Sequence, residues 1–226
     1  LAYSLGQWEG VAAGKALGRL AVRDAGDSWI LAAAMSSAVP HLESIVAVVS
    51  QAKEAAAGQS ELISQLLTLA AATHREDTIV SLIPVIRRDD QGRYSAWQLG
   101  ALGELLDLLD RRETTLAKFR ASASPPLQAE IDGLAPLFAF ARATAGDASA
   151  ALDDRLAAVR LLGRGLTDQE ADAVVLAERL APGENEAVRA AAIANLGGQS
   201  GEQVPRVLLD AWRGYTPQSR GEALDV

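Results

Sequence analysis

The sequence predicts an all-α fold in which antiparallel helix pairs stack into an α-solenoid, a superhelix of repeated units. Alanine and leucine, which favour helices, dominate a chain that is 49% hydrophobic and only 4% aromatic. The stretch Asn185–Gly197 has the pattern of one short capped helix, and related stretches recur along the chain. A single helix pair cannot bury its apolar face alone, so such units must stack on their neighbours.

The first helices are expected between glycine, aspartate and proline breaks. Gly6 should end the first helix, and Asp27 is placed to cap the third. The helices expected up to residue 88 are Leu1–Gly6, Val11–Arg23, Ser28–Val39, His41–Ala57 after a first-turn Pro40, Glu61–Thr73 capped by Ser60, and Glu76–Arg88 kinked at Pro84.

A turn at Asp89–Gly92 precedes the most apolar helix, predicted at Arg93–Arg111. Residues 1–226 are expected to form a single solenoid that is a fragment of a larger protein. Ser122–Pro126 is typical of a loop or a domain seam, which makes 121–126 a candidate seam. The other helices are expected at Thr114–Arg120, Leu127–Ala145 with Pro136 inside, Asp154–Gly163, Asp168–Leu180 capped by Thr167, Asn185–Gly197, Glu202–Trp212 and Pro217–Val226.

The repeat is clearest when Arg155 is aligned with Arg189, which places Gly163 on Gly197 at an offset of 34 residues. Arg220 starts a truncated copy 31 residues further on, and Asp27–Met35 matches Glu186–Ile193. We expect the arginines to form a ladder, each reaching an acid in a loop one repeat away. A loop acid, a hydrophobic–Arg pair and an alanine-rich helix ending in Leu-Gly resemble HEAT-like repeats; residues 58–150 depart from this pattern.

Both ends of the chain also resemble a family of large multidomain proteins. The residues that carry this resemblance are Leu5-Gly6, Trp8, Leu17–Leu20, Asp24, Asp27–Ile30, Ser36-Ser37, Trp212–Pro217 and Arg220–Asp225. They are similar to the helical-repeat segment of exported planctomycete proteins described as membrane-bound dehydrogenases with a haem-binding domain. The resemblance implies a preceding β-propeller, a following c-type cytochrome domain and a periplasmic or otherwise exported location.

Composition excludes several kinds of chemistry. The chain contains no cysteine, which excludes disulfides, thiolate metal sites and haem attachment on this chain. A net charge of −8 argues against nucleic acid and anionic membrane surfaces as partners, and no apolar run is long enough to span a bilayer. His41 and His74 are 33 residues apart and could lie on equivalent faces, but they favour surface or cap roles over a metal site.

The remaining polar clusters favour structural roles. Three acid pairs are expected to cap helices or face helix dipoles rather than bind calcium: Asp24/Asp27, Asp89/Asp90 and Asp153/Asp154. Arg87-Arg88 and Arg111-Arg112 should complement helix dipoles and do little else. The glycines of Gly163–Gly165 and Gly197-Gly198 are expected to end helices rather than cradle phosphate.

The four tryptophans are the strongest candidates for an interaction surface. Trp29 and Trp97 are expected in the core, whereas Trp8 and Trp212, beside loops, fit either core or surface. No catalytic, cofactor-binding or metal-binding residue is predicted.

We therefore expect a non-catalytic scaffold or protein-interaction module that joins the propeller and cytochrome domains of an exported redox protein. One alternative is that the repeats form part of the docking or substrate surface of a flanking dehydrogenase. Another is self-association through exposed helix faces. The expected partner is protein, and the oligomeric state is left open.

Overall fold

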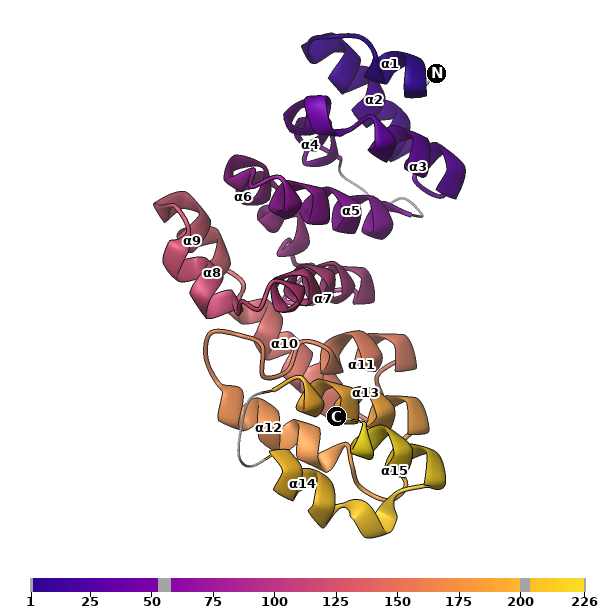
Figure 1. Ribbon diagram of the computed structural model, residues 1–226, viewed down its shortest axis with the longest axis vertical. Helices are drawn as coiled ribbons and strands as arrows, with labels where there is room; N and C mark the ends of the chain where they lie inside the picture. The colour runs from indigo at the N-terminus through magenta and orange to yellow at the C-terminus, as the bar shows by residue number, and fades with distance from the viewer. Residues whose placement is uncertain (1, 53–57, 200–203, 226) are drawn as a thin grey trace.

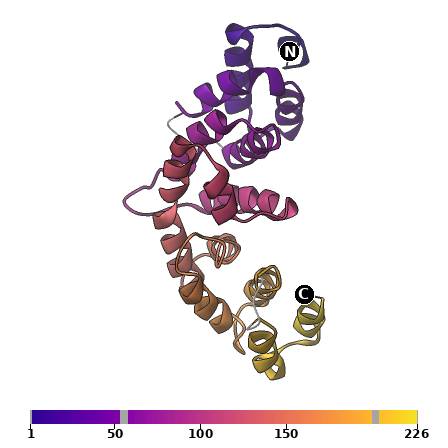
Figure 2. The same cartoon turned by 60° about the vertical axis from the view of Figure 1, so that its left-hand side comes forward.

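The computed structural model describes residues 2–52, 58–199 and 204–225. Over these ranges the fold is all-α, and the only extended pairing is an isolated bridge between Asp90 and Arg93. Figure 1 shows helices following one another along the long axis of the molecule, and Figure 2 shows that the arrangement is curved.

The helices are arranged in two rows. In the first row each helix contacts the next. Its members are α1 (Ala2–Gly6), α3 (Ser28–Ser36), α5 (Gln59–Ala72), α7 (Ala96–Arg111), α11 (Leu152–Val159), α13 (Glu186–Gly197) and α15 (Pro217–Leu224). The helices that match one another in sequence are thus placed in one row.

The second row starts with α2 (Val11–Arg23), α4 (Leu42–Val49), α6 (Glu76–Ile86) and α9 (Pro125–Asp132), each in contact with the next. Further along, α10 (Ala135–Gly146) packs on α12 (Gln169–Glu178). The remaining short elements are η1 (Val39–His41), α8 (Leu116–Ser122), α14 (Val204–Asp210) and η2 (Trp212–Gly214). The additional α8–α9 pair lies within residues 58–150, where the sequence departs from the repeat.

Two helices, α2 and the helix after Asn185, have the predicted bounds, and side-chain caps are present at the start of α3 and α13. The Asp27 carboxylate accepts hydrogen bonds from the amides of Trp29 (2.9 Å) and Ile30 (3.2 Å), and the Asn185 side chain accepts one from Ala187 (2.9 Å). These bonds satisfy amides that have no partner inside the helix.

Several predicted helix starts are wrong. Helix α5 begins at Gln59, directly after Gly58 in a left-handed conformation (φ 85°), so Ser60 is not its cap. A Cβ atom at Gly58 would lie 2.0 Å from the Ala25 carbonyl oxygen, which explains why glycine is needed there. Helix α12 is preceded by Asp168 (φ 62°) rather than capped by Thr167.

A capping box delays the start of α7. The Ser95 side chain bonds the backbone at Gln98, and the Gln98 side chain accepts from the Ser95 amide at 2.9 Å. The helix therefore begins at Ala96 instead of Arg93.

Other predicted helices are too long. The predicted Leu127–Ala145 helix is two helices, because the chain breaks at Gly133-Leu134 and Pro136 occupies the first turn of α10, where proline is tolerated. Helix α3 ends at Ser36, α4 at Val49 and α11 at Val159. The predicted continuation of α4 lies partly in 53–57, outside the described residues.

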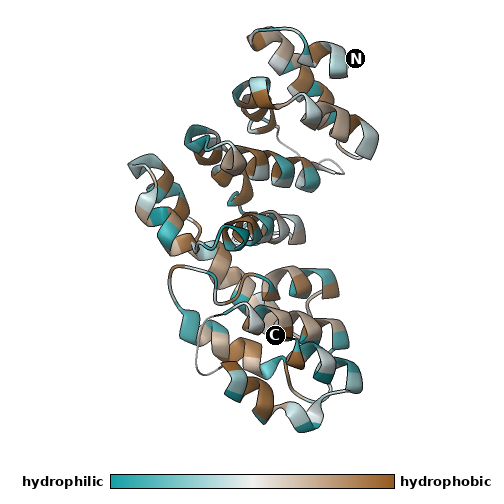
Figure 3. Ribbon diagram, in the orientation of Figure 1, coloured by the Kyte–Doolittle hydropathy of each residue, from teal (hydrophilic) through white to brown (hydrophobic). Residues whose placement is uncertain are grey.

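The core is one cluster that runs the length of the chain. It includes fully buried side chains in both rows, such as Leu17, Leu66, Leu102, Leu137 and Ile193. Figure 3 shows hydrophobic and hydrophilic residues on the same helices, as expected when each helix buries one face. The candidate domain seam at residues 121–126 stays a prediction.

Within the described residues, no single helix has both the length and the apolarity of a bilayer span. Helix α3 and the segment Val39–Val49 reach the length and apolarity of a bilayer span only when they are taken together across a 78° bend.

Candidate functional site: a polar groove along the first row

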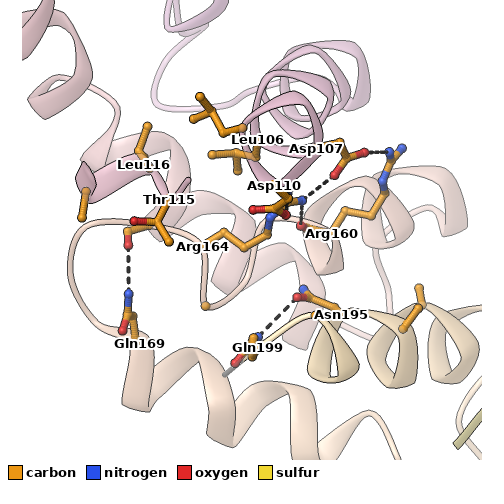
Figure 4. A pocket seen from close by; sticks show the side chains of 17 residues that line it. Leu106, Asp107, Asp110, Thr115, Leu116, Arg160, Arg164, Gln169, Asn195 and Gln199 are labelled. Atoms are coloured by element: carbon orange, nitrogen blue, oxygen red, sulfur yellow. Dashed lines mark hydrogen bonds and ion pairs between the residues drawn. The ribbon is translucent and has the colours of Figure 1, made fainter. Parts of the chain in front are cut away.

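A groove of about 630 Å³ lies between the C-terminal part of α7, the start of α8, the α11–α12 link and helix α13. Figure 4 shows its charged and amide side chains, which come from α7, the link after α11, the start of α12, and α13 with the residues that follow it. Parts of three consecutive units thus share one surface.

Four charged side chains form a network across the groove. The Arg160 guanidinium donates to Asp107 at 2.7 Å, and Arg164 bonds Asp107 at 2.8 Å and Asp110 at 2.7 Å (Figure 4). Asp107 and Asp110 lie one helical turn apart on α7, and the two arginines are also one turn apart in sequence, so the pairs align. The charges neutralise one another, and each exposed pair contributes only about 0.2–1 kcal/mol.

Small side chains and amides form the opposite side of the groove. Gly163, Gly165, Gly198, Ala191 and Ala194 all line it. Of these residues, Ala194 and Gly198 are exposed, whereas Gly165 is buried and Gly163 lies against the Gln199 side chain. The accessible small-residue surface is therefore on the α13 side of the groove.

Two amides fix the α13 side of the groove. The Asn195 amide donates to the carbonyls of Val159 and, at 3.1 Å, Leu162, at the end of α11. Gln199 donates to the same Leu162 carbonyl at 3.3 Å and to the Asn195 side-chain oxygen at 3.3 Å (Figure 4). Side chains of one unit therefore donate to carbonyls at the end of the preceding unit's helix, which holds the groove wall in place.

Glu104 lies one turn before Asp107 on α7. Partial burial raises the pKa of its carboxyl above the ordinary value, and the negative charges of Glu61 and Asp107 raise it further. Arg160 and a hydrogen bond with Ser64 oppose this rise.

Neither histidine lies in the groove. His41 is 5% exposed at the start of α4, whereas His74 is exposed in the α5–α6 turn with φ 55°. Both histidines lie in the turn before a second-row helix, but they differ in burial, so a surface role is wrong for His41. His41 occupies the N-cap position of α4, although its side chain makes no capping hydrogen bond. Among the residues that the structure describes, no cluster of three or more His, Cys, Asp or Glu side chains is suited to hold a metal ion.

The acid pairs have mixed outcomes. Asp27 caps α3 as predicted, and Asp153 and Asp154 lie in the first turn of α11. Asp89 caps no helix; its carboxylate accepts from the Gly92 amide at 2.6 Å inside the turn. Asp24 pairs with Arg23 at the end of α2.

The basic pairs have larger roles than predicted. Arg87 forms an ion pair with Glu130 of α9 at 2.9 Å. Arg88 donates to the Ala52 carbonyl at 3.4 Å, and Arg112 donates to the Ala71 carbonyl at 3.0 Å. These arginines join successive units rather than only complementing their own helix dipoles.

The arginine ladder is only partly confirmed. Arg155 is 6% exposed and reaches Glu184, in the loop one repeat later, at 2.8 Å. Arg189 instead bonds Glu186 of its own helix at 2.8 Å and carbonyls of its own preceding loop. Arg220 lies over the Trp212 ring, 5.7 Å from its centre, which is a cation–π geometry.

The tryptophans divide differently from the prediction. Trp29 is 85% exposed, so the expectation that it lies in the core is wrong. Trp97 is partly buried against the core as expected, and Trp212 packs near Tyr215. Trp8 is 66% exposed and thus belongs to the surface.

Comparison with family models, with curated proteins and with solved structures found no match. The function must therefore be argued from the geometry of the chain itself.

Sequence reasoning did not identify the groove residues. The usable signals were two acids one turn apart on α7 and two arginines one turn apart near Gly163. No pattern in the sequence indicates that residues 53 or 54 positions apart, such as Asp107 with Arg160 and Asp110 with Arg164, meet in space.

Proposed function

We propose that this chain is a HEAT-like α-solenoid that acts as a non-catalytic scaffold, and that the groove along α7, α11 and α13 binds a protein segment. Two rows of stacked helices and the sequence match among first-row helices support the solenoid assignment. Such repeats build extended surfaces, and this groove is shared by three successive units.

The observation that carries the proposal is the pairing of the groove charges. Asp107, Asp110, Arg160 and Arg164 already satisfy one another, which leaves no isolated acid or base poised for catalysis among them. A neutral, partly apolar groove with a small-residue side suits an extended polypeptide better than a small charged substrate.

The test places a large side chain in the groove, on the side that is lined by small residues. Ala194 is exposed on α13 and lines the groove, so Ala194→Arg should block a bound segment without disturbing the core. Ala187→Arg adds the same side chain to an exposed position of the same helix outside the groove. Peptides selected from a random displayed library on the wild-type chain should bind Ala194→Arg at least about tenfold more weakly.

The Ala187→Arg variant should bind the selected peptides with unchanged affinity. If the library yields no binder, or if both variants bind equally well, the groove is not a polypeptide-binding surface.

We further propose, from the family resemblance, that the scaffold belongs to an exported redox protein and spaces a propeller from a cytochrome domain. The gene that encodes the chain offers the test. A C-x-x-C-H haem-attachment motif downstream would support this context, and its absence from the complete coding sequence would contradict it.

A further inference from the structure

The end of the molecule formed by α1 and α2 presents a second surface, separate from the groove. Helix α2 packs against α4 through Gly14 and Gly18, where backbones approach closely: a Cβ atom at Gly18 would lie 3.1 Å from the Ile45 Cα atom. Helix α1 packs on α3. The outer side of both helices faces away from the rest of the described chain (Figure 2).

An apolar hollow lies on this outer side. Its volume is about 440 Å³, and it is lined by Leu5 of α1 and by Ala16, Leu20, Arg19 and Arg23 of α2. The lining is mainly apolar, since arginine contributes its methylene stem to such a surface. We call this hollow the end trough.

Exposed apolar side chains lie beside the end trough in the chain. Trp8 is 66% exposed, and its amide donates to the Leu5 carbonyl at 3.2 Å, so it directly follows the α1 side of the trough. Val11, which begins α2, is 61% exposed. An exposed tryptophan next to an apolar hollow is a typical anchor for a protein partner.

A basic stripe borders the trough. Lys15, Arg19 and Arg23 are exposed and lie four residues apart, which places them on one face of α2. Helix α2 contains no acidic residue although the chain carries a net charge of −8. Among the described residues, the ion pairs of this helix are confined to Arg23 with Asp24, so the charges of Lys15 and Arg19 face solvent.

We propose that the end trough docks an amphipathic α-helix whose apolar stripe is flanked by Asp or Glu residues. Residues four apart on a helix are separated by about 6 Å along the axis, so carboxylates at that spacing on the partner match the stripe on α2. A helix also fits because its apolar ridge can fill the hollow between α1 and α2.

The test uses a fluorescein-labelled amphipathic peptide with leucines on one face and flanking glutamates, measured by fluorescence anisotropy. The control peptides carry lysine or glutamine in place of glutamate. The acidic peptide should bind the full chain, more weakly as salt rises, and the control peptides should bind at least about tenfold more weakly.

Charge-reversal variants locate the binding surface. Lys15→Glu/Arg19→Glu should weaken binding of the acidic peptide at least about tenfold, and Trp8→Ala should weaken it without changing the charge. Lys118→Glu/Arg206→Glu changes the net charge equally at exposed positions elsewhere and should leave the affinity within about twofold. Circular dichroism verifies that each variant keeps its helix content.

Three outcomes would overturn the proposal. The first is that the acidic peptide does not bind, and the second is that the lysine or glutamine peptide binds as tightly as the acidic one. The third is that Lys118→Glu/Arg206→Glu loses as much affinity as Lys15→Glu/Arg19→Glu. A last experiment measures binding of the chain to vesicles made of equal parts phosphatidylcholine and phosphatidylserine. If they bind through Lys15 and Arg19 while the peptide does not, the stripe recognises an anionic membrane instead of a helix.

Discussion

Asp172 connects α12 to two other parts of the chain. Its side chain is 1% exposed, pairs with the Arg142 guanidinium and accepts a hydrogen bond from the Gly163 amide at 2.8 Å. One buried carboxylate thereby holds α10, α12 and the turn after α11, which forms one edge of the groove.

Replacing Asp172 with Asn should lower the free energy of unfolding by about 2–4 kcal/mol, because Arg142 loses its buried counter-ion. Urea denaturation measures the change. Asp153→Asn removes a carboxylate from an exposed position of α11 and should change stability by no more than about 0.5 kcal/mol. Equal effects of the two substitutions would mean that the buried pair has no special role.

Glu104 makes stability depend on pH. Because its folded-state pKa is raised, chiefly by burial, the ionised side chain opposes folding at neutral pH, and protonation removes that cost as pH falls. Glu104→Gln should therefore raise the melting temperature at pH about 7, and the gain should disappear near pH about 4, where the wild-type carboxyl is protonated.

Glu9→Gln serves as the control for this experiment, since Glu9 is exposed in the α1–α2 loop. It should show no comparable gain at neutral pH. A Glu104→Gln gain that persists unchanged in acid would contradict the protonation argument.

At the scale of helices, side chains from one unit cap the helix ends of another. Asn195 caps the end of α11, Arg112 bonds the last turn of α5, and Arg179 donates to the Ala145 and Gly146 carbonyls at 3.2 Å. Helix C-termini leave carbonyls without partners, so these contacts stabilise both helices and the joint between units.

Asn195→Ala should lower stability by about 1 kcal/mol, because the Val159 and Leu162 carbonyls each lose one of their donors. Gln218→Ala, on exposed α15, removes only a contact with Glu222 and should cost less than about 0.5 kcal/mol. Thermal denaturation of both variants tests this difference; a neutral Asn195→Ala would show that water replaces the amide without loss.

At the scale of the whole molecule, the main helix–helix contacts among the described residues join near neighbours along the two rows. The stability of such an arrangement is close to a sum of local terms, so damage at one end should remain local. Leu17 of α2 and Ile193 of α13, both fully buried, lie near opposite ends of the rows.

Leu17→Ala should open a cavity that costs about 2–5 kcal/mol, and hydrogen exchange should accelerate in α1–α4 while α11–α15 stay protected. Ile193→Ala should give the reverse pattern. Uniform acceleration across the chain in either variant would instead indicate one cooperative unit.

The sequence by itself determined the helical class and the helices whose ends depend on adjacent residues. Asp27 and Asn185 cap the amides directly after them, and Asn185–Gly197 forms the predicted helix, because capping and glycine preferences act over a few residues. The resemblance among the first-row helices likewise reflects one local pattern repeated.

Tertiary structure decided what joins distant parts of the chain. The exposure of Trp29 and the pairing of Asp107 with Arg160 have no local signature in the sequence. Asn185–Gly197 illustrates both cases. The bounds of this helix follow from its own residues, whereas its place in the groove wall depends on bonds from Asn195 to residues more than thirty positions away. Stacking sets those distances, and stacking depends on the packing of whole helix faces.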